Sequence, residues 1–170
     1  AVAEHVCIRQ VVESALALVV PPPGFRVEVC GPDVEVHAPR APLEPLDFDG
    51  RGVFLKPNFN SADPTPGSTH NATLEALIGE LQARGAASIT LGERSGMGDT
   101  REVMKEKAIF QMAERLGVET VVFDELNESQ WQLIDEPEHH WERGFAFPKM
   151  VLEADAVVQT CCLKTHRFGG

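Results

Sequence analysis

The residues best suited to chemistry form one consecutive group, Lys164, Thr165 and His166. They follow the apolar, β-branched and cysteine-containing run Val157 to Leu163, which is typical of a buried strand. The group offers a cation, a hydroxyl and an imidazole within one loop. Ligands of open α/β sheets bind beyond the carboxyl ends of the strands. We therefore interpret Lys164 and His166 as candidate catalytic residues, and His166 also as a candidate metal ligand.

A second polar group follows an earlier strand. The short apolar run Val53 to Leu55 leads directly into Lys56 and Asn58, which are candidate cofactor-binding residues. In a parallel sheet the carboxyl ends of the strands share one edge, so these two side chains are expected to converge with the Lys164 and His166 pair on an anionic or metal-bound ligand. The alternative is that Lys56 is a solvated charge at a strand end and that Asn58 caps a turn.

The glycine-rich loop Gly92 to Gly98 precedes a predicted helix. Its three glycines would let backbone N–H groups approach an anion, which a helix N-terminus also favours. However, the loop lacks both the Lys-Ser/Thr ending of a Walker loop and the G-x-G-x-x-G spacing, and Glu93 and Asp99 place carboxylates where a phosphate would sit. We favour a plain strand-to-helix connection with Glu93 as a candidate cofactor ligand or base.

Other side chains that can bind metals are scattered. His70 precedes a predicted helix, whose N-terminus favours a neutral imidazole suited to metal binding or general-base work, so it is a candidate metal ligand. An ordinary loop histidine is the alternative. Cys161 and Cys162 are adjacent in a predicted strand and are interpreted as two small buried residues on opposite faces, rather than as a redox or metal pair.

Strands that alternate with helices position these residues. The alternation predicts an α/β fold with a mostly parallel, Rossmann-like sheet, helices on both faces and right-handed crossovers. The predicted strands of this sheet are Val53 to Leu55, Ser88 to Leu91, Glu119 to Phe123 and Ala156 to Leu163, with a further short strand at Trp131 to Ile134 and a short helix at Phe147 to Ala154.

The two longer helices carry capping signals. The first is expected to begin at Ser68 or Asn71 and to end at Gly85 in the left-handed conformation. The second is predicted as one helix from Thr100 to Leu116, with Asp99 as its N-cap.

The first 48 residues follow another pattern. An amphipathic helix is predicted over Ala3 to Val19, and a β-hairpin over Phe25 to Cys30 and Val34 to Ala38. We expect residues 1–48 to form an accessory layer and residues 49–170 to form the α/β domain.

Composition excludes several classes of partner. A formal net charge of −11 argues against nucleic acid and anionic membranes, since both attract clustered Lys and Arg. No apolar run approaches the roughly 20 residues of a membrane span. The four cysteines are too few for a disulfide scaffold, which indicates a reducing, cytoplasmic location.

Four motifs occur in a recognisable order: Val53-Phe54-Leu55-Lys56-Pro57-Asn58, Ser68-Thr69-His70-Asn71, Gly92-Glu93-Arg94-Ser95-Gly96 and Leu163-Lys164-Thr165-His166-Arg167-Phe168-Gly169-Gly170. Together they resemble the domain-of-unknown-function-362 family of bacteria and archaea over about residues 52–170. The family's activity is largely unassigned. Its members tend to continue past the loop that contains Lys164, Thr165 and His166, so the resemblance implies that this chain is the N-terminal part of a longer domain.

Some family members are fused to ferredoxin-type modules, which implies redox-linked chemistry, but this sequence has no four-cysteine iron–sulfur motif. A looser likeness to the lactate racemase family, which holds a nickel cofactor through Lys and His, implies that Lys164 and His166 serve a metal-containing or anionic ligand.

Two hypotheses follow. The leading one is a small-molecule or metal-cofactor site at the strand ends, completed by a missing C-terminal part. The alternative is a non-catalytic or electron-transfer-accessory module that docks a partner protein through its acidic surface. The cofactor is not specified beyond a metal ion as one option, and the sequence identifies no reaction.

Overall fold

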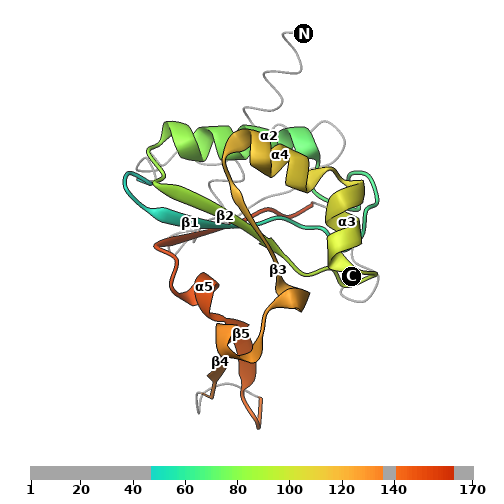
Figure 1. The fold of residues 1–170 in the computed structure, drawn as a ribbon, viewed down its shortest axis with the longest axis vertical. Helices are drawn as coiled ribbons and strands as arrows, with labels where there is room; N and C mark the ends of the chain where they lie inside the picture. Colours follow the sequence, from blue (N-terminus) through green and yellow to red (C-terminus); the bar gives the residue numbers. More distant parts are fainter. Residues whose placement is uncertain (1–46, 136–140, 163–170) are drawn as a thin grey trace, which may run out of the picture.

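The computed structural model describes residues 47–135 and 141–162. A four-stranded sheet forms its centre, in the order β3-β2-β1-β6, and every neighbouring pair is parallel (Figure 1). This arrangement confirms the predicted α/β fold. The strands are β1 (Gly52–Lys56), β2 (Ser88–Glu93), β3 (Glu119–Val122) and β6 (Ala156–Gln159).

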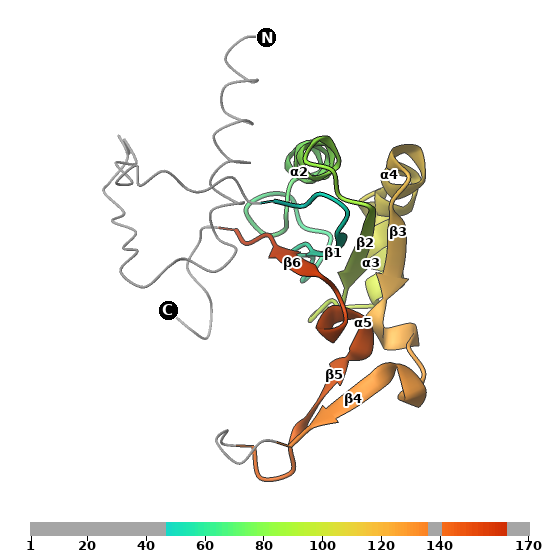
Figure 2. The same cartoon turned by 90° about the vertical axis from the view of Figure 1, so that its left-hand side faces the viewer.

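Helices lie on both sides of this sheet, unequally. In Figures 1 and 2, α2 and α4 cover one face, while the four-residue α5 lies on the other side. The helices are α2 (Asn71–Ala83), α3 (Thr100–Glu106), α4 (Ile109–Leu116) and α5 (Lys149–Leu152).

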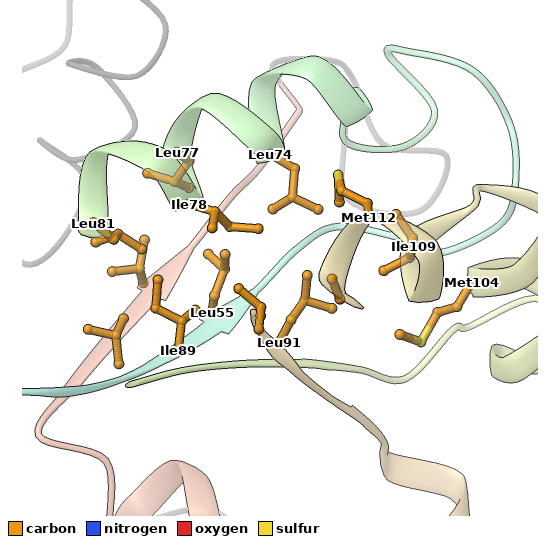
Figure 3. Packing of buried hydrophobic residues seen from close by; sticks show 14 of the residues in the cluster. Leu55, Leu74, Leu77, Ile78, Leu81, Ile89, Leu91, Met104, Ile109 and Met112 are labelled. Carbon is orange, nitrogen blue, oxygen red and sulfur yellow. The ribbon is translucent and has the colours of Figure 1, made fainter. Parts of the chain in front are cut away.

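The main core lies between the sheet and the helices α2, α3 and α4. Because side chains alternate along a strand, Val53 and Leu55 point to this face while Phe54 points to the other. Helix α2 meets them with an apolar stripe at helical spacing (Figure 3). The stripe consists of Leu74, Leu77, Ile78 and Leu81, each with no exposed surface.

The start of α2 differs from the sequence prediction. His70, rather than Ser68 or Asn71, is the N-cap, and its Nδ1 accepts a hydrogen bond from the Ala72 backbone N–H at 3.2 Å. The two predicted caps are used elsewhere: Ser68 donates to the Ser61 carbonyl at 2.5 Å, and Asn71 donates to the Lys107 carbonyl at 2.6 Å. The predicted terminator Gly85 does adopt a left-handed conformation, with φ of 84°.

The predicted helix from Thr100 to Leu116 is divided into two. Asp99 caps α3 as predicted, since its Oδ1 accepts from the Glu102 N–H at 2.9 Å. The chain then turns at Ala108, which has a left-handed φ of 54°, before α4 begins. Asn71 at the start of α2 takes up the Lys107 carbonyl at this break, so a contact between two helices accompanies the turn.

A small antiparallel hairpin interrupts the α/β pattern after β3. Two short 3-10 helices, η1 (Phe123–Glu125) and η2 (Glu128–Gln130), lead into β4 (Trp131–Ile134), which pairs with β5 (Phe145–Pro148). Figure 2 shows this hairpin extending away from the sheet. Pro148 then precedes α5, and the chain returns to β6.

Some predictions fall outside the described residues. They include the helix Ala3 to Val19 and the hairpin that follows it, so the division at residue 48 stays a prediction. Across the described part of the chain, every helix falls short of the length and apolarity that a bilayer span requires.

Replacing Ala108 with glycine should stabilise the protein by about 0.5–1 kcal/mol, because a left-handed conformation costs an L-residue roughly 1–2 kcal/mol and glycine almost nothing. Urea denaturation of the two proteins measures the difference. The matched control is Ala76→Gly in the interior of α2, which should lower the stability by about 1 kcal/mol. A loss of stability in both variants would show that the turn at Ala108 is not strained.

Candidate functional site

A cavity of about 700 Å³ opens on the sheet face opposite α2 and α4. It lies at the carboxyl ends of β1 and β6 and is bounded by η1, the β4–β5 hairpin and α5. The residues that line it are Phe54, Lys56, Pro57, Asn58, Asn60, Arg94, Phe123, Trp131, Ala146, Phe147, Pro148, Val151, Val157, Gln159, Thr160, Cys161 and Cys162.

One wall of the cavity is aromatic. Phe54 from β1 stacks with Phe123 from η1 at a centroid distance of 5.8 Å, and Phe123 meets the edge of Trp131 at 6.4 Å. Gly92 of β2 makes this stack possible, because a Cβ atom there would overlap both phenylalanine rings. The missing side chain of one strand residue therefore leaves room for aromatic rings from two other elements.

Polar groups form the rim. Lys56 and Gln159 are register partners at the ends of β1 and β6, and Asn58 and Thr160 follow them in the chain. The sequence predicts that the segment Lys56-Pro57-Asn58 and the end of the last strand share one edge of the sheet. This is confirmed for the described residues. Lys164 and His166 lie outside those residues, so their convergence with Lys56 stays a prediction.

Glu93 is the most deeply buried charged residue of this region, with 1% of its surface exposed. Its Oε2 accepts from the Phe59 backbone N–H at 2.8 Å, and its Oε1 accepts from the Arg94 N–H at 2.7 Å and from the Lys56 ammonium. Lys56 also donates to the Pro57 carbonyl at 3.0 Å. Glu93 therefore holds the Lys56 side chain and the backbone at Phe59 and Arg94 in place. It is not among the residues that line the cavity. Its predicted role as a ligand or base stays a prediction.

Asn58 is held through its backbone. Its N–H donates to Thr69 Oγ1 at 2.9 Å, its carbonyl accepts from the Thr69 N–H at 2.9 Å, and Thr69 Oγ1 meets Thr160 Oγ1 at 2.8 Å. Thr69 thus ties the segment after β1 to the segment after β6. Asn58 is half-buried and is one of the residues that line the cavity.

The glycine-rich loop after β2 is held by hydrogen bonds to its neighbours. The Ser95 N–H donates to Thr100 Oγ1 at 2.9 Å, and the Met97 N–H donates to the Asn60 carbonyl at 3.0 Å. Ser95 Oγ donates to the Phe59 carbonyl at 2.6 Å. These bonds anchor the loop to the segment after β1 and agree with a plain strand-to-helix connection rather than a phosphate cradle.

His70 is exposed at the start of α2 and is not among the residues that line the cavity. Within residues 47–135 and 141–162, no group of three or more His, Cys, Asp or Glu side chains is placed to hold a metal ion. Metal binding by His70 and His166 therefore stays a prediction.

The prediction of two buried cysteines is wrong. Cys161 is exposed and Cys162 is half-buried, and both line the cavity. The reason is that β6 ends at Gln159 rather than at residue 163, so the two residues follow the sheet instead of being enclosed in it.

Sequence reasoning missed most of the cavity wall and part of its rim. Phe54 and Val157 could have been found from the alternation of side chains, because they lie on the strand face opposite the main core. Trp131 and Phe147 gave no comparable signal, since their place depends on how the hairpin approaches the sheet. The other cavity-lining residues that it did not single out as a site are Pro57, Asn60, Arg94, Phe123, Ala146, Pro148, Val151, Gln159 and Thr160.

Arg94 on the rim belongs to a polar network. Its Nε donates to Asp124 Oδ1 at 2.9 Å, while Thr100 donates to Asp124 Oδ2 at 2.5 Å. The hydrogen bond from Thr100 is the largest cause that lowers the pKa of Asp124 below its ordinary value. Burial opposes it, and the hydrogen bond and charge of Arg94 lower the pKa further.

The Lys56 and Glu93 pair should be strongly coupled in stability. Lys56→Met leaves a buried carboxylate without its cation and should cost roughly 3 kcal/mol, below the loss expected of a fully buried pair because Lys56 is 32% exposed. The double variant Lys56→Met/Glu93→Gln should recover part of this loss. Urea denaturation of the wild type, both single variants and the double variant measures the coupling. Strictly additive losses would contradict a direct interaction.

Asp124→Asn should lower stability at neutral pH by at most about 1 kcal/mol, because the carboxylate is 44% exposed and its ion pair is screened. A lowered pKa in the folded state stabilises the protein above the unfolded value of about 3.9, and this contribution is lost as the pH falls through the folded value. The difference between wild type and variant should be constant from pH 5 to 7 and shrink below about pH 4. A difference that grows on acidification would contradict the sign of the shift.

Comparison with known proteins adds one finding on ancestry. The family described as Domain of unknown function (DUF362) matches residues 53–170, which is more than half of the chain. No curated protein and no solved structure matches this chain. The looser likeness to the lactate racemase family has no support among these findings. The resemblance drawn from the four motifs is confirmed: the chain belongs to the DUF362 family, a family of unknown function.

Proposed function

We propose that this protein binds a small organic molecule in the cavity at the carboxyl ends of β1 and β6. The observation that carries the proposal is the joining of an aromatic wall and a polar rim around one space of about 700 Å³. Ligand pockets commonly have volumes of roughly 300–1,000 Å³, with apolar walls and a few polar groups that fix orientation. The position is also the one at which open parallel sheets bind ligands.

Within this proposal the aromatic wall receives a ring, and Lys56 and Asn58 orient its polar end. Lys164 and His166 remain the proposed catalytic residues because of their place in the chain. They follow Cys162, a cavity-lining residue, by two and four positions, and four residues span at most about 14 Å.

An organic ligand is favoured over a metal ion held by the described residues alone, because they provide no group of three ligating side chains. Docking of a partner protein stays a prediction from the net charge of −11. We propose the cytoplasm as the compartment, in keeping with the free thiols of Cys161 and Cys162.

Binding can be followed at Trp131, because the chain contains two tryptophans and one of them lines the cavity. In a ¹H–¹⁵N correlation spectrum, the variant Trp141→Phe assigns the indole N–H signal of Trp131. Titration with two fused-ring compounds, isoquinolin-1-one and naphthalene-1-carboxylate, should shift that signal with saturation. Ala146→Phe, which narrows the cavity without changing charge, should weaken binding at least about tenfold, a loss of about 1.4 kcal/mol.

The matched control is Ala83→Phe at the exposed end of α2, which should bind as the wild type does. Thermal denaturation of both variants checks that they are folded. The proposed site is wrong if neither compound shifts the Trp131 signal at millimolar concentration. It is also wrong if Ala146→Phe and Ala83→Phe bind the compounds equally well.

A further inference from the structure

The charges on the cavity rim are already neutralised by the protein. Of the described residues that line the cavity, Lys56 and Arg94 carry a charge. Lys56 is paired with the buried Glu93, and Arg94 with Asp124. Both carboxylates lie outside the lining, so each cation reaches the cavity together with a compensating negative charge. Among residues 47–135 and 141–162, a ligand at this rim therefore meets polar groups whose charges are largely compensated.

Lys56 has little capacity left as a donor. An ammonium group has three N–H bonds. Among the described residues, one is directed to Glu93 and a second to the Pro57 carbonyl. The single N–H bond that remains suits one acceptor oxygen of a ligand. A phosphate or carboxylate would in addition lie close to the Glu93 carboxylate, whose charge opposes it.

The remaining rim is dominated by amide side chains. Asn58, Asn60 and Gln159 all line the cavity, and within residues 47–135 and 141–162 their side-chain amides have no hydrogen-bond partner. A primary amide offers donors and acceptors together. Three such groups are complementary to a ligand edge on which an N–H and a carbonyl stand side by side.

The aromatic wall sets the shape of the other part of the ligand. Phe54 and Phe123 lie nearly parallel, with 21° between their planes, and Trp131 meets Phe123 edge-on at 74°. Aromatic rings gain from stacking and edge contacts beyond the burial of their area. A flat conjugated ring uses these contacts, whereas a flexible aliphatic chain does not.

We propose that the cavity selects an uncharged heteroaromatic ring with a lactam-type edge, in which an N–H donor adjoins a carbonyl acceptor. This inference rests on the proposed function and narrows it to a class of ligand. It also departs from the expectation that Lys56 neutralises an anion, because Glu93 already occupies that cation. Any anionic substituent of the ligand lies beyond the rim formed by the described residues.

The two fused-ring compounds used above separate ring recognition from anion recognition, because both contain two fused six-membered rings and they differ in the polar group. Isoquinolin-1-one presents a neutral lactam edge, and naphthalene-1-carboxylate presents an anion. The lactam should bind about tenfold more tightly, because its N–H and carbonyl can pair with both the acceptor and the donor of a rim amide, whereas a carboxylate only accepts and lies close to the Glu93 charge. The dissociation constants are measured from the Trp131 signal.

Two variants test the cause of this preference. Gln159→Leu should weaken lactam binding about fivefold and affect naphthalene-1-carboxylate less, because the lactam loses a donor and an acceptor while the carboxylate loses only a donor. The matched control is Gln111→Leu on the exposed face of α4. Asp124→Asn releases the charge of Arg94 and should strengthen binding of the carboxylate about threefold without affecting the lactam.

The outcomes distinguish the two levels of the proposal. If both compounds bind at the cavity but the carboxylate binds as tightly as the lactam, the inference fails while the proposed function stands. Equal effects of Gln159→Leu and Gln111→Leu would overturn it in the same way. If neither compound shifts the Trp131 signal, the proposed function fails and the inference fails with it.

Discussion

The buried carboxylate of Glu93 is the interaction on which the sheet edge depends. It joins the end of β2 to the Lys56 side chain at the end of β1 and to the backbone N–H groups of Phe59 and Arg94. A carboxylate without these partners would be very costly at 1% exposure. The same bonds that satisfy Glu93 fix both loops that follow the two central strands, and with them one side of the cavity.

The two faces of the sheet are put to different uses. One face is sealed by α2, α3 and α4 over a continuous hydrophobic core. The other carries the Phe54 and Phe123 stack, which Gly92 admits, and is bordered by the hairpin and α5 rather than by long helices. A closely packed first face provides stability, while the partly open second face leaves room for a ligand.

Local patterns in the sequence predicted much of this fold. Apolar periodicity located the four parallel strands, the short strand at Trp131 and the helix now labelled α2, because strand and helix periods depend on neighbouring residues alone. These local patterns failed where distant residues intervene: Asn71 is one of the two caps that the sequence predicts for its own helix, yet it binds the Lys107 carbonyl at the break between α3 and α4. The expected burial of Cys161 failed because β6 ends earlier than its apolar run.

The sequence by itself determined the α/β class, the family and the presence of Lys56 and Asn58 at a strand end. Only the tertiary structure decided that Glu93 neutralises Lys56, that Asp124 neutralises Arg94 and that Trp131 borders the same cavity. The two ion pairs join residues that are 37 and 30 positions apart in the chain. Periodicity and capping signals extend over only a few residues, so they carry no information on which charges meet once the loops are folded together.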